Sequence, residues 1–302
     1  MRQKCAAMLV LPVEPDRERA GAAARLWFEL CSARLLGELG AAVRAEASGR
    51  QGGFGALVGT TLYPPDGYQG SPGEWDAEYS PRAWAELLRR AVTLPDNTVF
   101  EAYTLDGRGE RGRPWVVGSE VGSGFAELSS DVDDALANDA AGQQLIRATV
   151  REVAEIGAPV AVAVSEQLGR SQTPLERALQ RSVTKRAEAA SVLRNYGWLT
   201  VLNEEMTDRV GGLSRLRAGG AFVEAEPLAA GGTWLVATET WDEYGPEQAN
   251  RLFELLAPVL PPGKPSLTQF GAPLTPGGPQ LRIELPNVVA ERDPREVIGQ
   301  RL

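Results

Sequence analysis

The residues best suited to chemistry in this 302-residue chain are clustered carboxylates. The stretch ETWDEYGPE carries Glu239, Asp242 and Glu243 at the point where a predicted strand gives way to a predicted helix. Oxygen ligands of this kind can bind a divalent metal, and paired carboxylates can act as general acid and base. A carboxylate- or metal-dependent enzyme is therefore one hypothesis that the sequence leaves open.

A second acidic cluster, SSDVDDALAND, contains Asp131, Asp133, Asp134 and Asp139. Its spacing is loosely that of a calcium-binding loop, but it has no glycine at the sixth position and no glutamate at the twelfth. Acidic residues at the start of a helix are stabilised by the helix dipole, which explains the cluster better. We expect no metal here.

Histidine is absent from the chain. Catalytic triads, Cys–His dyads and histidine-based metal sites are therefore excluded. The run GRGERG, Gly107 to Gly112, matches the dinucleotide-binding pattern in its letters, but a predicted strand follows it where that motif requires a helix. We interpret it as a hairpin loop and expect no cofactor.

The stretch NYGWLTVLNEE raises the question of a catalytic strand end. Asn203 stands between an apolar run and a helical pattern, followed by Glu204 and Glu205. Asn is a preferred N-cap, and acidic residues are favoured in the first helical turn. The sequence therefore predicts a capped helix rather than paired catalytic carboxylates.

The net charge is −9 and the pI is about 4.9. A nucleic acid is a poor candidate partner for such a chain, because phosphates require a basic surface. No apolar stretch approaches the roughly 20 residues that span a bilayer, so we expect no membrane contact. The two cysteines, Cys5 and Cys31, fit a reducing compartment, and we expect a cytoplasmic protein.

A long segment rich in proline and glycine, residues 63–81, reads as a loop. Its aromatic residues alternate with acidic ones, and tyrosine and tryptophan are typical of interface hot spots. The acidic neighbours would attract a basic partner. The candidate partner-binding residues are Tyr63, Tyr68, Trp75, Asp76 and Tyr79. The alternative is that these aromatic residues form the loop's own small core.

The remaining patterns predict an α+β fold, with antiparallel sheets and helices on one face. Three successive strands between residues 98 and 129 indicate a meander. The βαββα order of residues 198–257 is that of a ferredoxin-like unit, and a similar order in the first half leaves a second such unit open. We predict an N-terminal α+β unit (1–165), a ferredoxin-like unit (166–265) and a proline-rich C-terminal extension (266–302).

Residues Tyr196 to Glu239 resemble bacterial immunity-type domains of polymorphic and type VI toxin systems. The resembling features are Gly197-Trp198 opening a strand, a short helix before Gly211-Gly212, and a hairpin at Gly231-Gly232. The resemblance covers about 45 residues and implies a protein that binds and neutralises a cognate toxin. It carries over no catalytic residue.

The leading hypothesis is a non-enzymatic protein-binding module, with immunity against a basic toxin as its specific form. The enzyme reading above is the alternative. A structural subunit of a larger assembly, docked through the proline-rich segment after residue 258, is a further one.

Overall fold

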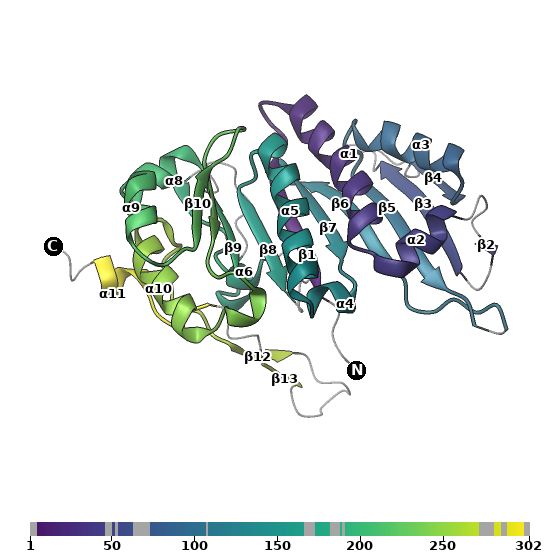
Figure 1. Ribbon diagram of the computed structural model, residues 1–302. Coiled ribbons are helices and arrows are strands. Elements are labelled where there is room, and N and C mark those ends of the chain that lie inside the picture. Colours follow the sequence, from purple (N-terminus) through teal and green to yellow (C-terminus); the bar gives the residue numbers. More distant parts are fainter. Residues whose placement is uncertain are drawn as a thin grey trace. The chain divides into compact units, whose positions relative to one another are not determined.

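The chain divides into two units, unit 1 (Met1–Pro159) and unit 2 (Val160–Leu302). The structure, a computed structural model shown in Figure 1, describes residues 5–45, 50–51, 54–62, 73–106, 108–165, 173–181, 188, 191–271, 281–284 and 289–298. The sequence places the boundary a few residues later, after residue 165, and the separate status of residues 266–302 remains a prediction.

Unit 1 alternates strands with helices and contains the meander that the sequence predicts. Its strands are β1 (Ala6–Pro12), β2 (Arg50–Gln51), β3 (Phe54–Leu62), β4 (Gly73–Glu78), β5 (Asn97–Thr104), β6 (Trp115–Gly122) and β7 (Phe125–Asp131). Its helices are α1 (Arg17–Arg34), α2 (Gly37–Ala45), α3 (Pro81–Ala91), α4 (Asp134–Ala137) and α5 (Ala140–Gly157).

These strands form one antiparallel sheet in the order β2-β3-β5-β6-β7-β1, and β4 pairs with β3 beside β2. The strands β5, β6 and β7 separate β1 from β3. A ferredoxin-like unit would place only one strand between its first two strands, so unit 1 does not have that order.

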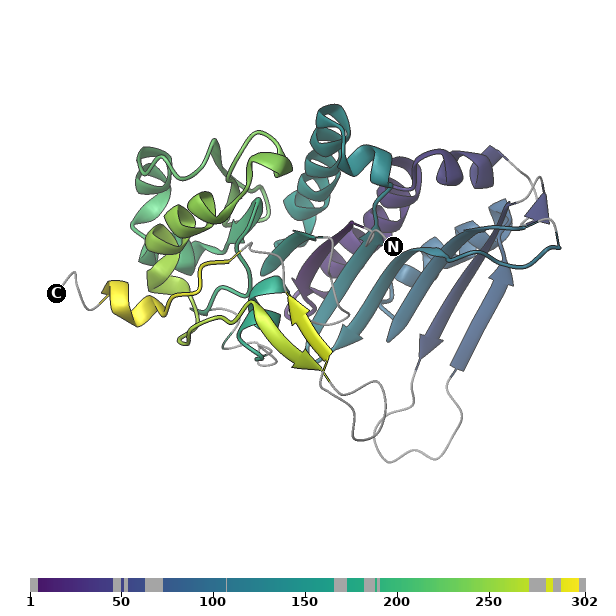
Figure 2. The same ribbon diagram turned by 90° about the horizontal axis from the view of Figure 1, so that it is seen from below.

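Helices cover one face of this sheet, as Figures 1 and 2 show for α1, α3 and α5. The core lies between the two layers, where Trp27 and Phe28 of α1 and Phe100 of β5 are fully buried. The Trp27 indole nitrogen donates a hydrogen bond of 3.0 Å to the Ser129 carbonyl, which ties α1 to the sheet. Among the described residues of unit 1, no helix lies on the opposite face of the sheet.

Unit 2 contains a second, smaller sheet and several short helices. The strands of unit 2 are β8 (Ala161–Ser165), β9 (Leu199–Leu202), β10 (Glu224–Pro227), β11 (Thr233–Val236), β12 (Thr268–Gly271) and β13 (Leu281–Glu284), and the smaller sheet consists of β9, β10 and β11. Its helices are α6 (Pro174–Ala178), α8 (Glu204–Arg209), α9 (Gly212–Ala218), η1 (Trp241–Glu243), α10 (Pro246–Leu256), η2 (Ala257–Val259) and α11 (Pro294–Ile298).

The central sheet of unit 2 has the order β10-β11-β9, and β11 is antiparallel to both neighbours. β9 and β10 are joined through α8 and α9 with β11 between them, which is a split βαβ arrangement. Gly231 and Gly232 both have positive φ, +94° and +86°, and form the predicted turn between β10 and β11. A ferredoxin-like description of the whole unit remains a prediction.

The predicted cap at Asn203 is confirmed. Its side-chain oxygen accepts a hydrogen bond of 2.8 Å from the Met206 amide at the start of α8. Glu204 and Glu205 occupy the first turn, as the helix dipole favours. These carboxylates therefore have a structural explanation.

Candidate functional site

The face of the sheet opposite the helices of unit 1 gathers acidic side chains. Neighbouring strands place residues directly opposite each other, and such residues lie on the same face. One row across the sheet runs Glu74, Thr61, Asn97, Glu120 and Glu127.

Two further rows lie beside the first. Asp76, Gly59, Val99, Gly118 and Ser129 form the middle row. Glu78, Leu57, Glu101 and Val116 form the third. Gly59 and Gly118 have no side chain, so the middle row is lower than the two acidic rows on either side of it.

Every carboxylate of β3 to β7 lies on this face, and none of these five strands contains lysine or arginine. We call this surface the acidic face, defined by Glu74, Asp76, Glu78, Glu101, Glu120, Glu127 and Asp131. Glu74, Asp76 and Glu120 are exposed, and none of the three has an ion-pair partner among the described residues. The strands of this face therefore contribute only negative charge, and Arg111 of the β5–β6 connection lies over the Tyr103 ring on the same face, 4.7 Å from its centroid.

One pair on the acidic face carries like charges directly opposite each other, Glu120 on β6 and Glu127 on β7. Like charges in such a position destabilise a sheet.

At the edge of the acidic face, β4 exposes one side of its backbone. The Tyr79 amide donates a hydrogen bond of 2.9 Å to the Ala56 carbonyl, which fixes the alternation of bonded pairs between β4 and β3. Because antiparallel strands alternate bonded and non-bonded pairs, the backbone groups of Glu74 and Asp76 point away from β3. In the described part of the chain, β4 pairs with no strand other than β3.

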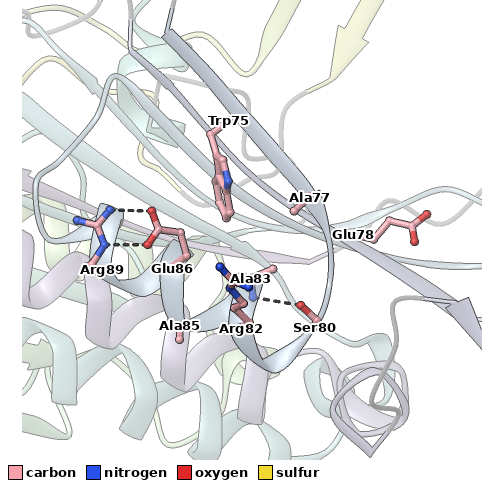
Figure 3. Close-up of a pocket in the computed structure, with 9 residues that line it drawn as sticks. All are labelled: Trp75, Ala77, Glu78, Ser80, Arg82, Ala83, Ala85, Glu86 and Arg89. Atoms are coloured by element: carbon pink, nitrogen blue, oxygen red, sulfur yellow. Dashed lines mark hydrogen bonds and ion pairs between the residues drawn. The ribbon is translucent and has the colours of Figure 1, made fainter.

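A hollow of about 720 Å³ lies beside this edge, between β4 and α3 (Figure 3). Trp75 and Ala77 form its strand wall, and the two basic residues Arg82 and Arg89 line it from α3. The sequence positions α3 through Ser80, whose hydroxyl accepts a hydrogen bond of 3.1 Å from the Ala83 amide, and through Pro81 in the first turn.

The helix wall of the hollow is held by a network of charges. Glu86 accepts hydrogen bonds of 2.7 and 2.8 Å from Arg89 and one of 2.7 Å from Arg90. These bonds, first from Arg89 and then from Arg90, lower the pKa of Glu86 to about 2. Arg82 has no ion-pair partner among the described residues, so the wall stays cationic.

The structure separates the predicted partner-binding residues. Trp75 and Asp76 lie on adjacent positions of β4 and therefore on opposite faces, with Trp75 toward the hollow and Asp76 on the acidic face. Tyr79 is buried at 8% exposure, and its ring packs 5.9 Å from Phe100. Tyr63 and Tyr68 lie outside the described residues.

The predicted loop over residues 63–81 is wrong for Gly73–Glu78, which form β4. The proline and glycine residues of the segment predict a loop, whereas the alternation in GEWDAE is typical of a strand. Its acidic residues face one side of β4, and Trp75 and Ala77 face the other. Tyr79 and Trp84 have ring centroids 6.1 Å apart within the core of unit 1. For Tyr79, the structure therefore agrees with the alternative prediction that aromatic residues of this segment pack into a core.

The acidic residues named as candidates for a metal enzyme do not gather. Among the residues that the structure describes, no group of three or more histidine, cysteine or acidic side chains could hold a metal ion. The Thr240 amide donates a hydrogen bond of 3.5 Å to Glu243, which belongs to the cap of η1. Asp242 and Glu243 are exposed on that short helix.

The other motifs have local structural roles. GRGERG lies in the connection between β5 and β6, closed by a bridge between Leu105 and Arg111, so its interpretation as a hairpin loop is confirmed. In SSDVDDALAND, Asp133 caps α4 and Asp139 caps α5. In the parts of the chain with described coordinates, no helix is long and apolar enough to cross a membrane.

The fold is that of an α+β protein with an exposed acidic sheet. No protein-family model and no curated protein matches the sequence. Among solved structures, the chain is similar to a Pseudomonas aeruginosa T6SS protein, PA0821, with a TM-score of 0.48 and 15% sequence identity. That similarity covers 85% of this chain and 76% of that chain. At this level of likeness, no residue role is transferred.

Proposed function

We propose that this protein is a non-enzymatic module that binds a basic protein through the acidic face of unit 1. The observation that carries the proposal is the placement of every carboxylate of β3 to β7 on one face of the sheet, in strands that contain no lysine or arginine. Clustered charge of one sign attracts an oppositely charged partner and speeds its association.

The position of Glu120 directly opposite Glu127 supports the same proposal. Two carboxylates held opposite each other gain from a bound cation that lies between them. A lysine or arginine of a partner would supply that cation. A polyanionic nucleic acid would be repelled.

Immunity is the specific form that we propose for this binding. An acidic face suits a protein that covers the functional surface of a basic toxin, and the resemblance of residues 196–239 implies the same role. The absence of histidine and of an intact catalytic motif in the sequence supports binding without catalysis.

Affinity capture from the native cell lysate tests the proposal. Tagged wild-type protein is compared with Asp76→Lys, which reverses a charge on the acidic face, and with Asp208→Lys, which reverses an exposed charge on α8 in unit 2. Bound proteins are identified by mass spectrometry.

We expect one stoichiometric basic partner on the wild type and on Asp208→Lys, and its loss on Asp76→Lys. Capture of the same partner by all three proteins would show that the partner does not bind through the acidic face. Capture of the protein's own copies alone would favour the structural-subunit alternative.

A further inference from the structure

We infer that the partner adds an antiparallel strand to β4, with its basic side chains over the acidic face and its aliphatic side chains in the hollow beside α3. This inference rests on the proposed function and names how that binding occurs. Three features of the structure support it: the backbone groups of β4 that point away from β3, the partly apolar hollow next to them, and the acidic side chains on the other face of this edge.

The backbone of β4 supplies the hydrogen bonds. Glu74 and Asp76 direct their amides and carbonyls away from β3, as the bond from Tyr79 to Ala56 establishes. Unpaired edge groups of this kind are a template for another strand, and strand addition is a recurrent way of binding extended peptides.

The hollow gives the added strand a second surface. An extended segment beside β4 points alternate side chains to opposite faces of the sheet. Those on the helix side enter the space of about 720 Å³ between β4 and α3, where Trp75, Ala77, Ala83 and Ala85 provide apolar contacts.

Charge determines which segment fits. Side chains opposite Glu74 and Asp76 meet carboxylates, so lysine or arginine is favoured there. The hollow is lined by two arginines and two glutamates, Arg82, Arg89, Glu78 and Glu86, together with Trp75 and three alanines, so an aliphatic residue fits its apolar part. The selected sequence alternates basic and aliphatic residues.

The same charges exclude a second copy of this chain as the occupant. Two β4 edges paired antiparallel would bring the carboxylates of one copy against those of the other. Like charges at opposed positions destabilise a sheet, so the acidic edge rejects self-pairing while it accepts a basic strand.

A synthetic peptide, acetylated and amidated Lys-Val-Lys-Val-Lys-Val-Lys, is the probe. In the inferred arrangement the lysine residues lie opposite Glu74 and Asp76, so their amides point toward β4 and the valine amides point away. One peptide is N-methylated at its lysine amides and a second at its valine amides. Both carry the same charges, and only the hydrogen-bonding edge differs.

Calorimetric titration of the full chain should show binding of the parent peptide and of the valine-methylated peptide within about threefold of each other. The lysine-methylated peptide should bind at least about tenfold more weakly, because it loses several backbone hydrogen bonds. Equal affinities for the two methylated peptides would overturn strand addition. Because the change is in the peptide, this comparison does not depend on a variant that folds.

Protein variants test the same edge. Asp76→Ala removes the charge and keeps the amide, whereas Asp76→Pro also removes an N–H that points away from β3. We expect Asp76→Pro to bind the parent peptide about fivefold to tenfold more weakly than Asp76→Ala. Hydrogen exchange should show the Glu74 and Asp76 amides protected when the peptide is bound.

Failure of strand addition can be distinguished from failure of the proposed function. If the captured partner is lost on Asp76→Lys but methylation and Asp76→Pro have no specific effect, the acidic face binds its partner without strand addition. If charge reversal has no effect on capture, the proposed function fails together with this inference.

Discussion

Arg90 of α3 lies over the ring of Trp75 on β4, with its guanidinium carbon 4.7 Å from the ring centroid. The same arginine donates a hydrogen bond of 2.7 Å to Glu86 and thereby joins the ring to the charges of the helix wall. This contact holds α3 against the edge strand and leaves the rest of the ring to line the hollow. The geometry of the inferred binding groove therefore depends on Trp75.

Replacement of Trp75 by alanine should weaken binding of the lysine–valine peptide by about tenfold, because a large apolar wall of the groove is lost. Loss of the cation–π contact and of the partial burial of the ring should lower the free energy of unfolding by about 1–2 kcal/mol. Calorimetric titration and urea unfolding measure the two effects. Leu62→Ala, at a side chain that is 58% exposed on β3, is the matched control and should alter neither greatly. Unchanged affinity in Trp75→Ala would contradict the groove.

Glu120→Lys should separate stability from binding. The lysine would face Glu127 directly, so a repulsive pair becomes an attractive one and the free energy of unfolding should rise by about 0.2–1 kcal/mol. The same change adds a cation to the acidic face, so affinity for the basic partner should fall. Thermal unfolding and a binding titration on the same preparation test both directions. A variant that is less stable and binds as well as the wild type would refute our account of this pair.

Acid should weaken the helix wall of the hollow. The hydrogen bonds from Arg89 and Arg90 lower the pKa of Glu86 from 4.5 to about 2. Because the folded-state pKa is depressed, the stabilisation from this carboxylate is fully present above pH 4.5 and is lost as the pH falls toward 2. The stability difference between the wild type and Glu86→Gln should be constant above pH 5 and shrink between pH 4.5 and 2. An NMR titration of the Glu86 carboxyl with a midpoint near 4.5 would contradict this prediction.

Unit 2 contains a buried ion pair between Arg194 and Glu176. Arg194 donates to Glu176 through two hydrogen bonds of 2.8 and 3.2 Å, and the two residues are only 5% and 2% exposed. Glu176→Gln leaves the guanidinium without its counter-charge and should cost about 3–5 kcal/mol. Calorimetric unfolding measures the loss. Replacement of both residues by leucine should cost less than the sum of the two single leucine variants, and strict additivity would argue against a coupled pair.

Much of the fold could be predicted from local sequence signals. The meander from β5 to β7 follows from alternating apolar residues, and the turn before β11 follows from Gly231-Gly232, both of which adopt positive φ. The cap at Asn203 and the start of α3 at Ser80 follow from side chains that accept backbone hydrogen bonds. Each of these features is decided by a few neighbouring residues.

The misjudged segments depend on contacts that are distant in sequence. The apolar spacing after Thr173 is that of a long helix, but α6 ends at Ala178 and Gln180 adopts a left-handed φ of +52°. Thr173 and Glu176 form the predicted type of helix start, a capping box, yet Glu176 is also bound by Arg194 from 18 residues away. Helical periodicity does not report such a tertiary partner.

The acidic face was only partly predictable. The alternation of Glu74, Asp76 and Glu78 with Trp75 and Ala77 is visible in the sequence, but no local pattern connects these acids with Glu101 and Glu120. Their common face depends on the pairing of β3, β4, β5 and β6, which no single segment specifies. The sequence does show that the acidic residues within one strand are separated by an even number of positions, which places them on the same face of that strand.

The salt dependence of partner affinity tests the central claim most directly. The captured basic partner is titrated onto the wild type, Glu120→Lys and Asp208→Lys at low and high ionic strength. We predict that the wild type and Asp208→Lys bind equally and lose affinity with salt, whereas Glu120→Lys binds more weakly and depends less on salt. Equal affinity and equal salt dependence for all three proteins would show that the acidic face of unit 1 does not bind the partner.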